Sequence, residues 1–319
     1  MNRENVVYVI LSLLFCSNSL SAQTDTIFVN KVSEVEFSGF FSAYSSLFDR
    51  NNNSYVYSAC SELGLIITDV SDINNPFVVD TVKTTELGNS KVSNIYQDGN
   101  YLYVSLGGFA GASQSPGLAI FDVSIPSSLT LLDVWKSDTL TQGSAKVVID
   151  GDYAYLGIME DGIAVLDVSD KNNIQILSTY QPDPTWPGAV SYAPNGRGMD
   201  IRNDTIFLAY DAGGLRIIDV SDKYNTVQVA QYINTSITSV AAPAYNNVRV
   251  KGNYAFVTVD YCGLDVIDIS DVNNIQSVNW YNPWNCVGAS WFGSIGHANE
   301  LILTNNDSVL FMTGGIVKF

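Results

Sequence analysis

The stretch GLRIIDVSD occupies residues 214–222, and close copies stand at 162–170 (GIAVLDVSD) and 263–271 (GLDVIDISD). Two more copies, GLIITDVSD and GLAIFDVSI, keep the same outline nearer the N-terminus. The first aspartates of the five copies are spaced by 53, 45, 52 and 49 residues. The chain is therefore organised as a repeat with a nearly constant period. These aspartates are Asp69, Asp122, Asp167, Asp219 and Asp268.

Short apolar runs flank every copy of the motif. Runs such as NYLYVSL and NYAFVTV come before it, and runs such as IQILSTY and VQVAQYI come after it. Their length, their Val, Ile, Tyr and Phe content and their Gly, Asn and Asp boundaries are typical of strands. With a shorter run ahead of each unit from the second onward, the repeat predicts four antiparallel strands, A to D, with the motif on strand C. The sequence therefore predicts an all-β fold, a β-propeller of four-stranded antiparallel blades.

The residues of the motif have structural explanations. Its glycine lets the chain enter strand C in a conformation that other residues resist. Its aspartates are expected to accept hydrogen bonds from nearby backbone amides and to end the strand in a tight turn. The stretch around Asp69 has some likeness to a calcium loop, but it lacks the glycine and glutamate that such loops need at their sixth and twelfth positions.

The repeated motif resembles the LVIVD repeats of secreted and surface proteins, over roughly residues 55–280 and five times. The resemblance implies a β-propeller and a secreted or surface-attached protein, and it implies no particular activity. The copies here depart from the usual pattern in the turn after the motif, where asparagines mostly replace a proline.

The two ends of the chain suggest how the predicted ring closes. Residues 308–314 (SVLFMTG) and 315–319 (GIVKF) are interpreted as strand B and the start of strand C of an incomplete sixth blade. A spare apolar run lies at 26–33 (TIFVNKVS). We expect six blades, with this N-terminal strand completing the last one. The alternative is that the chain is a fragment of a longer protein with further blades.

The N-terminus has the layout of a secretory signal peptide, with Arg3, an apolar run and a small-residue end. We expect cleavage after Ala22 and a single propeller domain at 23–319. Cys16 raises the alternative of a lipid anchor, which the bulky Phe15 before it disfavours. No later run is long enough to predict a membrane span. The protein is thus expected to be secreted or held at the cell surface.

The net charge of −17 disfavours nucleic acid as a partner, because phosphate contacts need clustered Lys and Arg. We expect a monomer whose partner is a surface protein or a carbohydrate.

The long connections all fall at the end of the predicted blades where B–C turns and D–A connections lie, at 106–116, 181–198, 234–246 and 282–297. Long loops in a compact domain are usually functional or disordered, and these carry aromatic side chains suited to stacking on sugars or anchoring a protein. The alternative is that the aromatic side chains plug the central channel. The predicted ligand-binding aromatics are Trp186, Tyr192, Tyr245, Trp284, Trp291 and Phe292.

Acidic residues also gather at this end, and Asp211 and Asp260 are the two predicted to bind a ligand. The cluster could hold a basic partner or a cation, with calcium the candidate cofactor; the alternative is solvated carboxylates with no cation and no cofactor. The acidic residues are Glu62, Glu160, Asp161, Asp211 and Asp260.

The few cysteine and histidine residues limit which disulfides, metal sites and catalytic sites the chain can form. Cys262 and Cys286 both fall at the long-loop end, and a disulfide between them is expected in an exported chain, with Cys60 left unpaired. A single histidine, His297, excludes a metal site built on several imidazoles. No GxSxG motif stands near it, and the repeated aspartate box of sialidase-like propellers is not found. We therefore predict no catalytic residues and no bound metal.

The function predicted from the sequence is a binding module for a protein or glycan ligand. The alternatives are a structural surface component and a glycan-active enzyme that uses paired carboxylates.

Overall fold

The computed structural model describes residues 8–13, 32–35, 43–108, 114–188, 193–239, 243–286, 297–303 and 309–315. The chain forms two compact units. Unit 1 comprises residues 1–30, 183–219 and 227–319, and unit 2 comprises residues 31–182 and 220–226.

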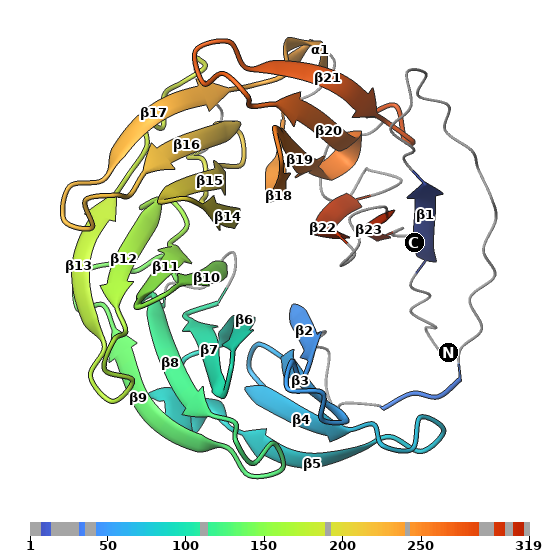
Figure 1. The fold of residues 1–319 in the computed structure, drawn as a ribbon, viewed down its shortest axis with the longest axis vertical. Helices are drawn as coiled ribbons and strands as arrows, with labels where there is room; N and C mark the ends of the chain where they lie inside the picture. The colour runs from blue at the N-terminus through green and yellow to red at the C-terminus, as the bar shows by residue number, and fades with distance from the viewer. Residues whose placement is uncertain are drawn as a thin grey trace. The chain divides into compact units, whose positions relative to one another are not determined.

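Unit 2 holds three four-stranded antiparallel sheets in which neighbouring strands follow one another in the chain (Figure 1). The first sheet contains β2 (Ser45–Phe48), β3 (Tyr55–Ala59), β4 (Leu65–Asp69) and β5 (Phe77–Val82). The second contains β6 (Val92–Asp98), β7 (Tyr101–Leu106), β8 (Gly117–Asp122) and β9 (Thr130–Lys136). The third contains β10 (Lys146–Asp150), β11 (Tyr153–Gly157), β12 (Ile163–Asp167) and β13 (Gln175–Tyr180). The 3₁₀ helix η1 (Thr84–Leu87) lies between the first and second sheets in sequence.

Unit 1 holds two more sheets of the same kind and a smaller one. The fourth sheet contains β14 (Gly198–Arg202), β15 (Thr205–Ala209), β16 (Leu215–Asp219) and β17 (Val227–Tyr232). The fifth contains β18 (Tyr245–Lys251), β19 (Tyr254–Val259), β20 (Gly263–Asp268) and β21 (Gln276–Tyr281), with α1 (Thr235–Thr238) before it and the 3₁₀ helix η2 (Asp260–Cys262) within it. The sixth sheet of the chain contains β22 (His297–Leu303), β23 (Val309–Gly315) and β1 (Tyr8–Leu13).

This three-stranded sheet differs from the sixth blade that the sequence predicted. β23 is the expected strand B, but its other neighbour is β1, which lies inside the predicted signal peptide. Of the predicted closing strand at 26–33, residues 26–31 lie outside the described residues, and residues 32 and 33 belong to no strand. Six blades closed by that strand are not confirmed. The physical reason is that a free strand edge can pair with any apolar extended segment, and the chain offers two.

The strands are buried according to their place in each sheet. β12 is typical of strand C, because its first four residues are fully buried on both faces. Its neighbour β13, a strand D, contains only exposed and half-buried residues because it is the free edge. Near-continuous apolar runs are expected where both faces of a strand pack against other sheets. The first strands β2, β6 and β10 lie next to one another in unit 2, as do β14, β18 and β22 in unit 1.

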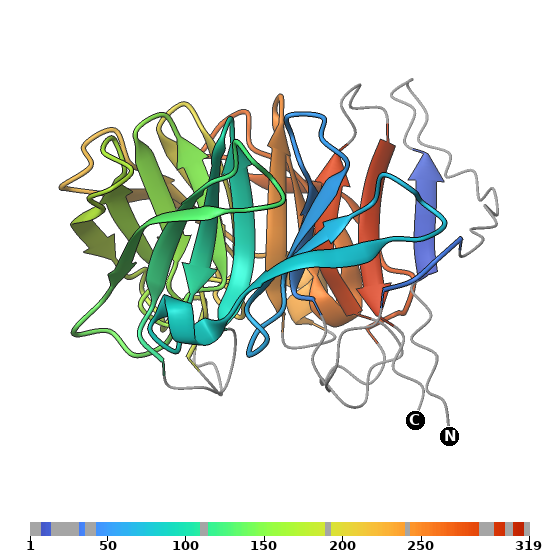
Figure 2. The same ribbon diagram turned by 90° about the horizontal axis from the view of Figure 1, so that it is seen from below.

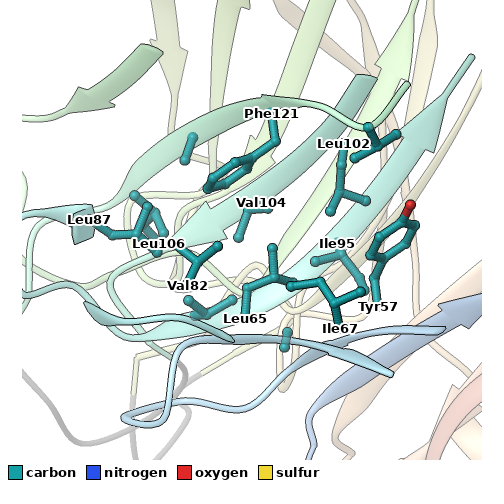
Figure 3. Close-up of a cluster of buried hydrophobic side chains, with 14 residues drawn as sticks. Tyr57, Leu65, Ile67, Val82, Leu87, Ile95, Leu102, Val104, Leu106 and Phe121 are labelled. Atoms are coloured by element: carbon teal, nitrogen blue, oxygen red, sulfur yellow. The ribbon is translucent and has the colours of Figure 1, made fainter. Parts of the chain in front are cut away.

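Each core lies between two successive sheets. Figure 3 shows side chains of β3 and β4, including Tyr57 and Ile67, meeting side chains of β7 and β8, including Leu102 and Phe121. In unit 1, Ile217 and Val257 belong to the equivalent cluster between the fourth and fifth sheets. Burial of these repeated aliphatic side chains is the main driving force for stacking one sheet on the next.

The motif acts as the sequence predicted. At its start, Gly214 has φ +77°, and a Cβ atom there would collide with the carbonyl oxygen of Tyr232 in strand D. At its end, Asp167 Oδ1 accepts hydrogen bonds from the backbone amide and hydroxyl of Ser169, at 2.8 and 2.6 Å. These bonds hold the pKa of Asp167 below its ordinary value. The same Asp-to-Ser amide bond occurs at Asp69, Asp122 and Asp268.

Candidate functional site

Strand order places the long connections at one end of each sheet. In an antiparallel sheet built in the order A to D, the B–C turn and the connection that leaves strand D lie at the same end; this is called the B–C end here. Figure 2 shows η1, which follows strand D of the first sheet, at this end of the sheets of unit 2. The C–D turns closed by the motif aspartates lie at the opposite end. The candidate site is the B–C end of unit 1.

Arg216, at the third position of the fourth motif, organises the connection that leads into the fourth sheet. Its side chain is fully buried. Its Nη2 donates to the carbonyl oxygens of Asp183 (3.0 Å) and Trp186 (3.2 Å), which lie in that connection. Its guanidinium carbon also lies 4.8 Å from the centroid of the Trp186 ring. The indole of Trp186 is half-buried, so one ring face contacts the arginine while part of the side chain stays accessible.

Asp265, at the third position of the fifth motif, has the corresponding role one sheet later. Its buried Oδ1 accepts hydrogen bonds from Ser277 Oγ (2.5 Å) and Asn234 Nδ2 (3.2 Å). Asn234 in turn caps α1, because its side-chain oxygen accepts a hydrogen bond from the backbone amide of Ser236. The backbone amide of Asn234 donates a hydrogen bond to the hydroxyl of Tyr245. The connection that begins at Asn234 is thus tied to strand C of the fifth sheet.

The carboxyl group of Asp265 is electrostatically unusual. Burial raises its pKa to about 6, although the hydrogen bonds from Ser277 and Asn234 act in the opposite direction. Its second oxygen, Oδ2, has no hydrogen-bond partner among the described residues. An ionised Asp265 is therefore held at a cost in folding free energy.

A disulfide anchors the third connection of this unit. Cys262, at the end of η2, is joined to Cys286, the pairing that the sequence predicted. Asn282 Oδ1 also accepts a hydrogen bond from the backbone amide of Cys286. Cys60 is a buried free thiol, and burial raises its pKa to about 11.

The predicted aromatic residues separate into three groups. Tyr245 begins β18 and is fully buried, and Trp284 is 7% exposed and packs with Leu264 and Met312 in the core between the fifth and sixth sheets. Both side chains are core residues and not the exposed ligand contacts that the sequence predicted. Trp186 is the predicted aromatic that keeps accessible surface among the described residues. Tyr192, Trp291 and Phe292 lie outside the described residues.

The two acidic residues predicted to bind a ligand are buried and paired. Asp211 Oδ2 accepts hydrogen bonds from Arg197 Nε (3.0 Å) and Asn195 Nδ2 (3.3 Å). Asp260 Oδ1 lies 2.8 Å from Nδ1 of His297, whose ring packs edge-on against Tyr261. Their side chains are only 2% and 4% exposed, so neither carboxylate faces solvent directly.

Lysine or arginine pairs with two of the five predicted acidic residues, Glu62 and Asp211. In unit 1, burial raises the pKa of Asp211 against the opposing effect of Arg197, and the nearby Asp260 raises it further. In unit 2, Lys91 Nζ lies 2.6 Å from Glu62 Oε1, and burial alone raises the pKa of Asp161. Within the described residues, no three His, Cys, Asp or Glu side chains converge as a set of metal ligands.

The anchoring residues Arg216 and Asp265 were not among the residues predicted from the sequence. The signal that could have found them is a departure from the repeat, because the same motif position holds an aliphatic side chain in the other three copies, Ile66, Ala119 and Ala164. A charged residue inside an apolar strand needs partners, and its partners are the connections.

Stacked four-stranded antiparallel sheets with short helices, repeated along the chain, define an all-β repeat protein of the kind that builds a β-propeller module. The LVIVD repeat pattern matches five segments that together span more than half of the chain, and the chain belongs to the LVIVD repeat family, whose repeats form β-propellers. The matched segments are 52–84, 90–135, 142–181, 201–233 and 245–282.

Among solved structures, the chain is similar in fold to the crystal structure of the computationally designed Ika8 protein. The TM-score is 0.51 at 9% sequence identity, covering 86% of this chain and 71% of the designed protein. No curated protein matches the chain. In the part of the chain that the structure describes, no helix has the length and apolar character needed to span a membrane.

Proposed function

We propose that this protein is an exported binding module that holds a protein or carbohydrate ligand at the B–C end of its sheets. The observation that carries the proposal is the anchoring of the connections in unit 1. Arg216, Asp265 and the Cys262–Cys286 disulfide each fix one connection to the sheet. Ordered loops on a rigid scaffold are a common basis of recognition, because little entropy is lost on binding.

Trp186 is the residue assigned to contact the ligand. Its ring is half-buried, it contacts the guanidinium group of Arg216, and it lies in an anchored connection. Tryptophan side chains supply large contact areas and stack on sugar rings or fill pockets of protein partners.

Two features support export. The Cys262–Cys286 disulfide fits an oxidising environment outside the cytoplasm. The first 22 residues have the charged, apolar and small-residue regions of a signal peptide in the expected order.

The second candidate function is a structural surface component. Its supporting observation is that Tyr245 and Trp284, two of the aromatics at this end, are used as core residues. A component of this kind would need the anchored connections only for its own stability.

A comparison of Trp186→Ala with Tyr224→Ala on arrays of glycans and purified surface proteins tests the proposal. Tyr224 is a matched control because it is 68% exposed and lies in the turn between β16 and β17, which joins the ends of these strands opposite the B–C turn. We expect parent and Tyr224→Ala to bind the same array member, and Trp186→Ala to bind it about tenfold or more weakly with an unchanged melting temperature. Equal binding by all three proteins, or no binding by the parent, would favour the structural component.

A further inference from the structure

The guanidinium of Arg216 joins three parts of unit 1. Besides the two carbonyl oxygens of the 183–186 connection, its Nη1 donates to Gln231 Oε1 (2.6 Å) on strand D. Its Nε donates to the carbonyl oxygen of Gly213 (2.9 Å) in the B–C turn. All three nitrogens are therefore hydrogen-bonded, and charge-assisted bonds of this kind are stronger than bonds between neutral groups.

Gly213 provides the room for this arrangement. A Cβ atom on Gly213 would lie 3.0 Å from Arg216 Nη2 and 2.6 Å from Cδ1 of Tyr210. The fourth motif is the copy in which a second glycine precedes the motif glycine, whereas Leu63 and Cys262 occupy this place in the first and fifth copies. The two departures of the fourth copy from the repeat, Gly213 and Arg216, thus meet at one point in space.

We infer that Arg216, with the space left by Gly213, is a positioning residue that sets the orientation of Trp186. Nη2 of the planar guanidinium group holds the backbone of the connection at residues 183 and 186, and the guanidinium lies over one face of the indole. The connection adds its own tight turn, since Asp183 Oδ1 accepts from the amide and hydroxyl of Thr185. A lysine cannot reproduce this, because an ammonium group lacks the planar fork and the stacking surface.

The inference rests on the proposed function only for the identity of the ligand-contacting residue, and its test needs no ligand. The protein is labelled with 5-fluorotryptophan, which gives one ¹⁹F resonance for each of the five tryptophans. The Trp186 resonance is assigned by its loss in Trp186→Phe. Spectra are then compared for the parent, Arg216→Met, Arg216→Lys and Gly213→Ala.

We expect Arg216→Met to move the Trp186 resonance by more than its linewidth, with a smaller change for Arg216→Lys. Gly213→Ala should move the same resonance, because the added methyl group displaces the guanidinium. The matched control is Ile217→Val, which removes one buried methylene from the next position of the same strand. It should lower the melting temperature and leave the Trp186 resonance in place.

An unmoved Trp186 resonance in Arg216→Met and Gly213→Ala overturns the inference. If Arg216→Met does not fold, Arg216→Lys and Gly213→Ala decide by the same criterion. The outcome is separable from that of the proposed function: if the resonance moves as expected but Trp186→Ala loses no binding on the arrays, the positioning role stands and the proposed function fails.

Discussion

The three repeats of unit 2 and the two four-stranded repeats of unit 1 share the same strand order, the same motif and the same kind of core, but they differ at one buried position. Ile66, Ala119 and Ala164 fill the third motif position in unit 2. Arg216 and Asp265 fill it in unit 1 and reach into the preceding connections. The repeat therefore specifies the scaffold, and departures from it at a buried position specify the loops.

The difference also shows in strand D. Gln228 and Ser277 of unit 1 face the buried charge and bond to it, at 3.4 Å from Arg216 Nη1 and 2.5 Å from Asp265 Oδ1. The equivalent residues in unit 2 are Val78, Leu131 and Ile176, which are 39–43% exposed. A buried charge in one strand is thus accompanied by a polar residue in the next, as expected if buried polar groups must be hydrogen-bonded.

The largest expected effect comes from placing an arginine in unit 2. Ala119→Arg puts a cation at a fully buried position whose cross-strand partners are Val104 and Val134. Without acceptors, the loss of unfolding free energy should be about 4 kcal/mol or more, enough to unfold this part of the chain. Chemical denaturation measures the effect. Ala119→Met, which adds a similar length of side chain without charge, should cost about 1–3 kcal/mol through overpacking; equal losses for the two variants would contradict the role assigned to the acceptors.

A second expected effect is the pH dependence that Asp265 gives to unit 1. Its folded-state pKa of about 6 lies above the unfolded value near 3.8, so the folded protein binds the extra proton between these pH values. Stability from this group is therefore lost as pH rises from about 4 to above 6. Asp265→Asn should remove this loss, gaining up to about 3 kcal/mol relative to the parent between pH 4 and pH 8.

Unfolding free energies of both proteins measured across that pH range provide the test. Parallel curves for the parent and Asp265→Asn would show that Asp265 does not titrate between pH 4 and pH 8. That result would contradict the raised pKa assigned to its buried carboxyl group.

The smallest effect on stability is expected from the motif aspartates, which have the same role in both units. Asp167→Ala in unit 2 removes the acceptor for the Ser169 amide and should lower the unfolding free energy by about 1 kcal/mol, because the turn is near the surface. Asp268→Ala in unit 1 should act in the same direction, since Asp268 accepts the equivalent bond from Ser270. Thermal melts of both variants check this; a change in ligand binding would contradict the purely structural role of the motif.

The sequence alone determined the repeat and with it the strand order, the motif on strand C and the tight turns after it. These are local features: a glycine that must adopt positive φ, an apolar run, and an aspartate that bonds two residues ahead. Each is visible in a window of nine residues, and five copies reinforce one another. The Cys262–Cys286 pairing was also within reach, because strand order brings both residues to the B–C end.

Only the tertiary structure decided how the connections are held and which aromatic side chain stays accessible. Trp186, Tyr245 and Trp284 look alike in the sequence as aromatics in or beside long loops, yet Tyr245 and Trp284 are core residues and Trp186 lies over an arginine. Burial and hydrogen-bond partners depend on contacts between segments far apart in the chain, such as Arg216 with residue 183 and Asp265 with residue 234. The same reason applies to β23, which pairs with β1 from the predicted signal peptide, because a strand pattern in the sequence does not show where a free strand edge lies in space.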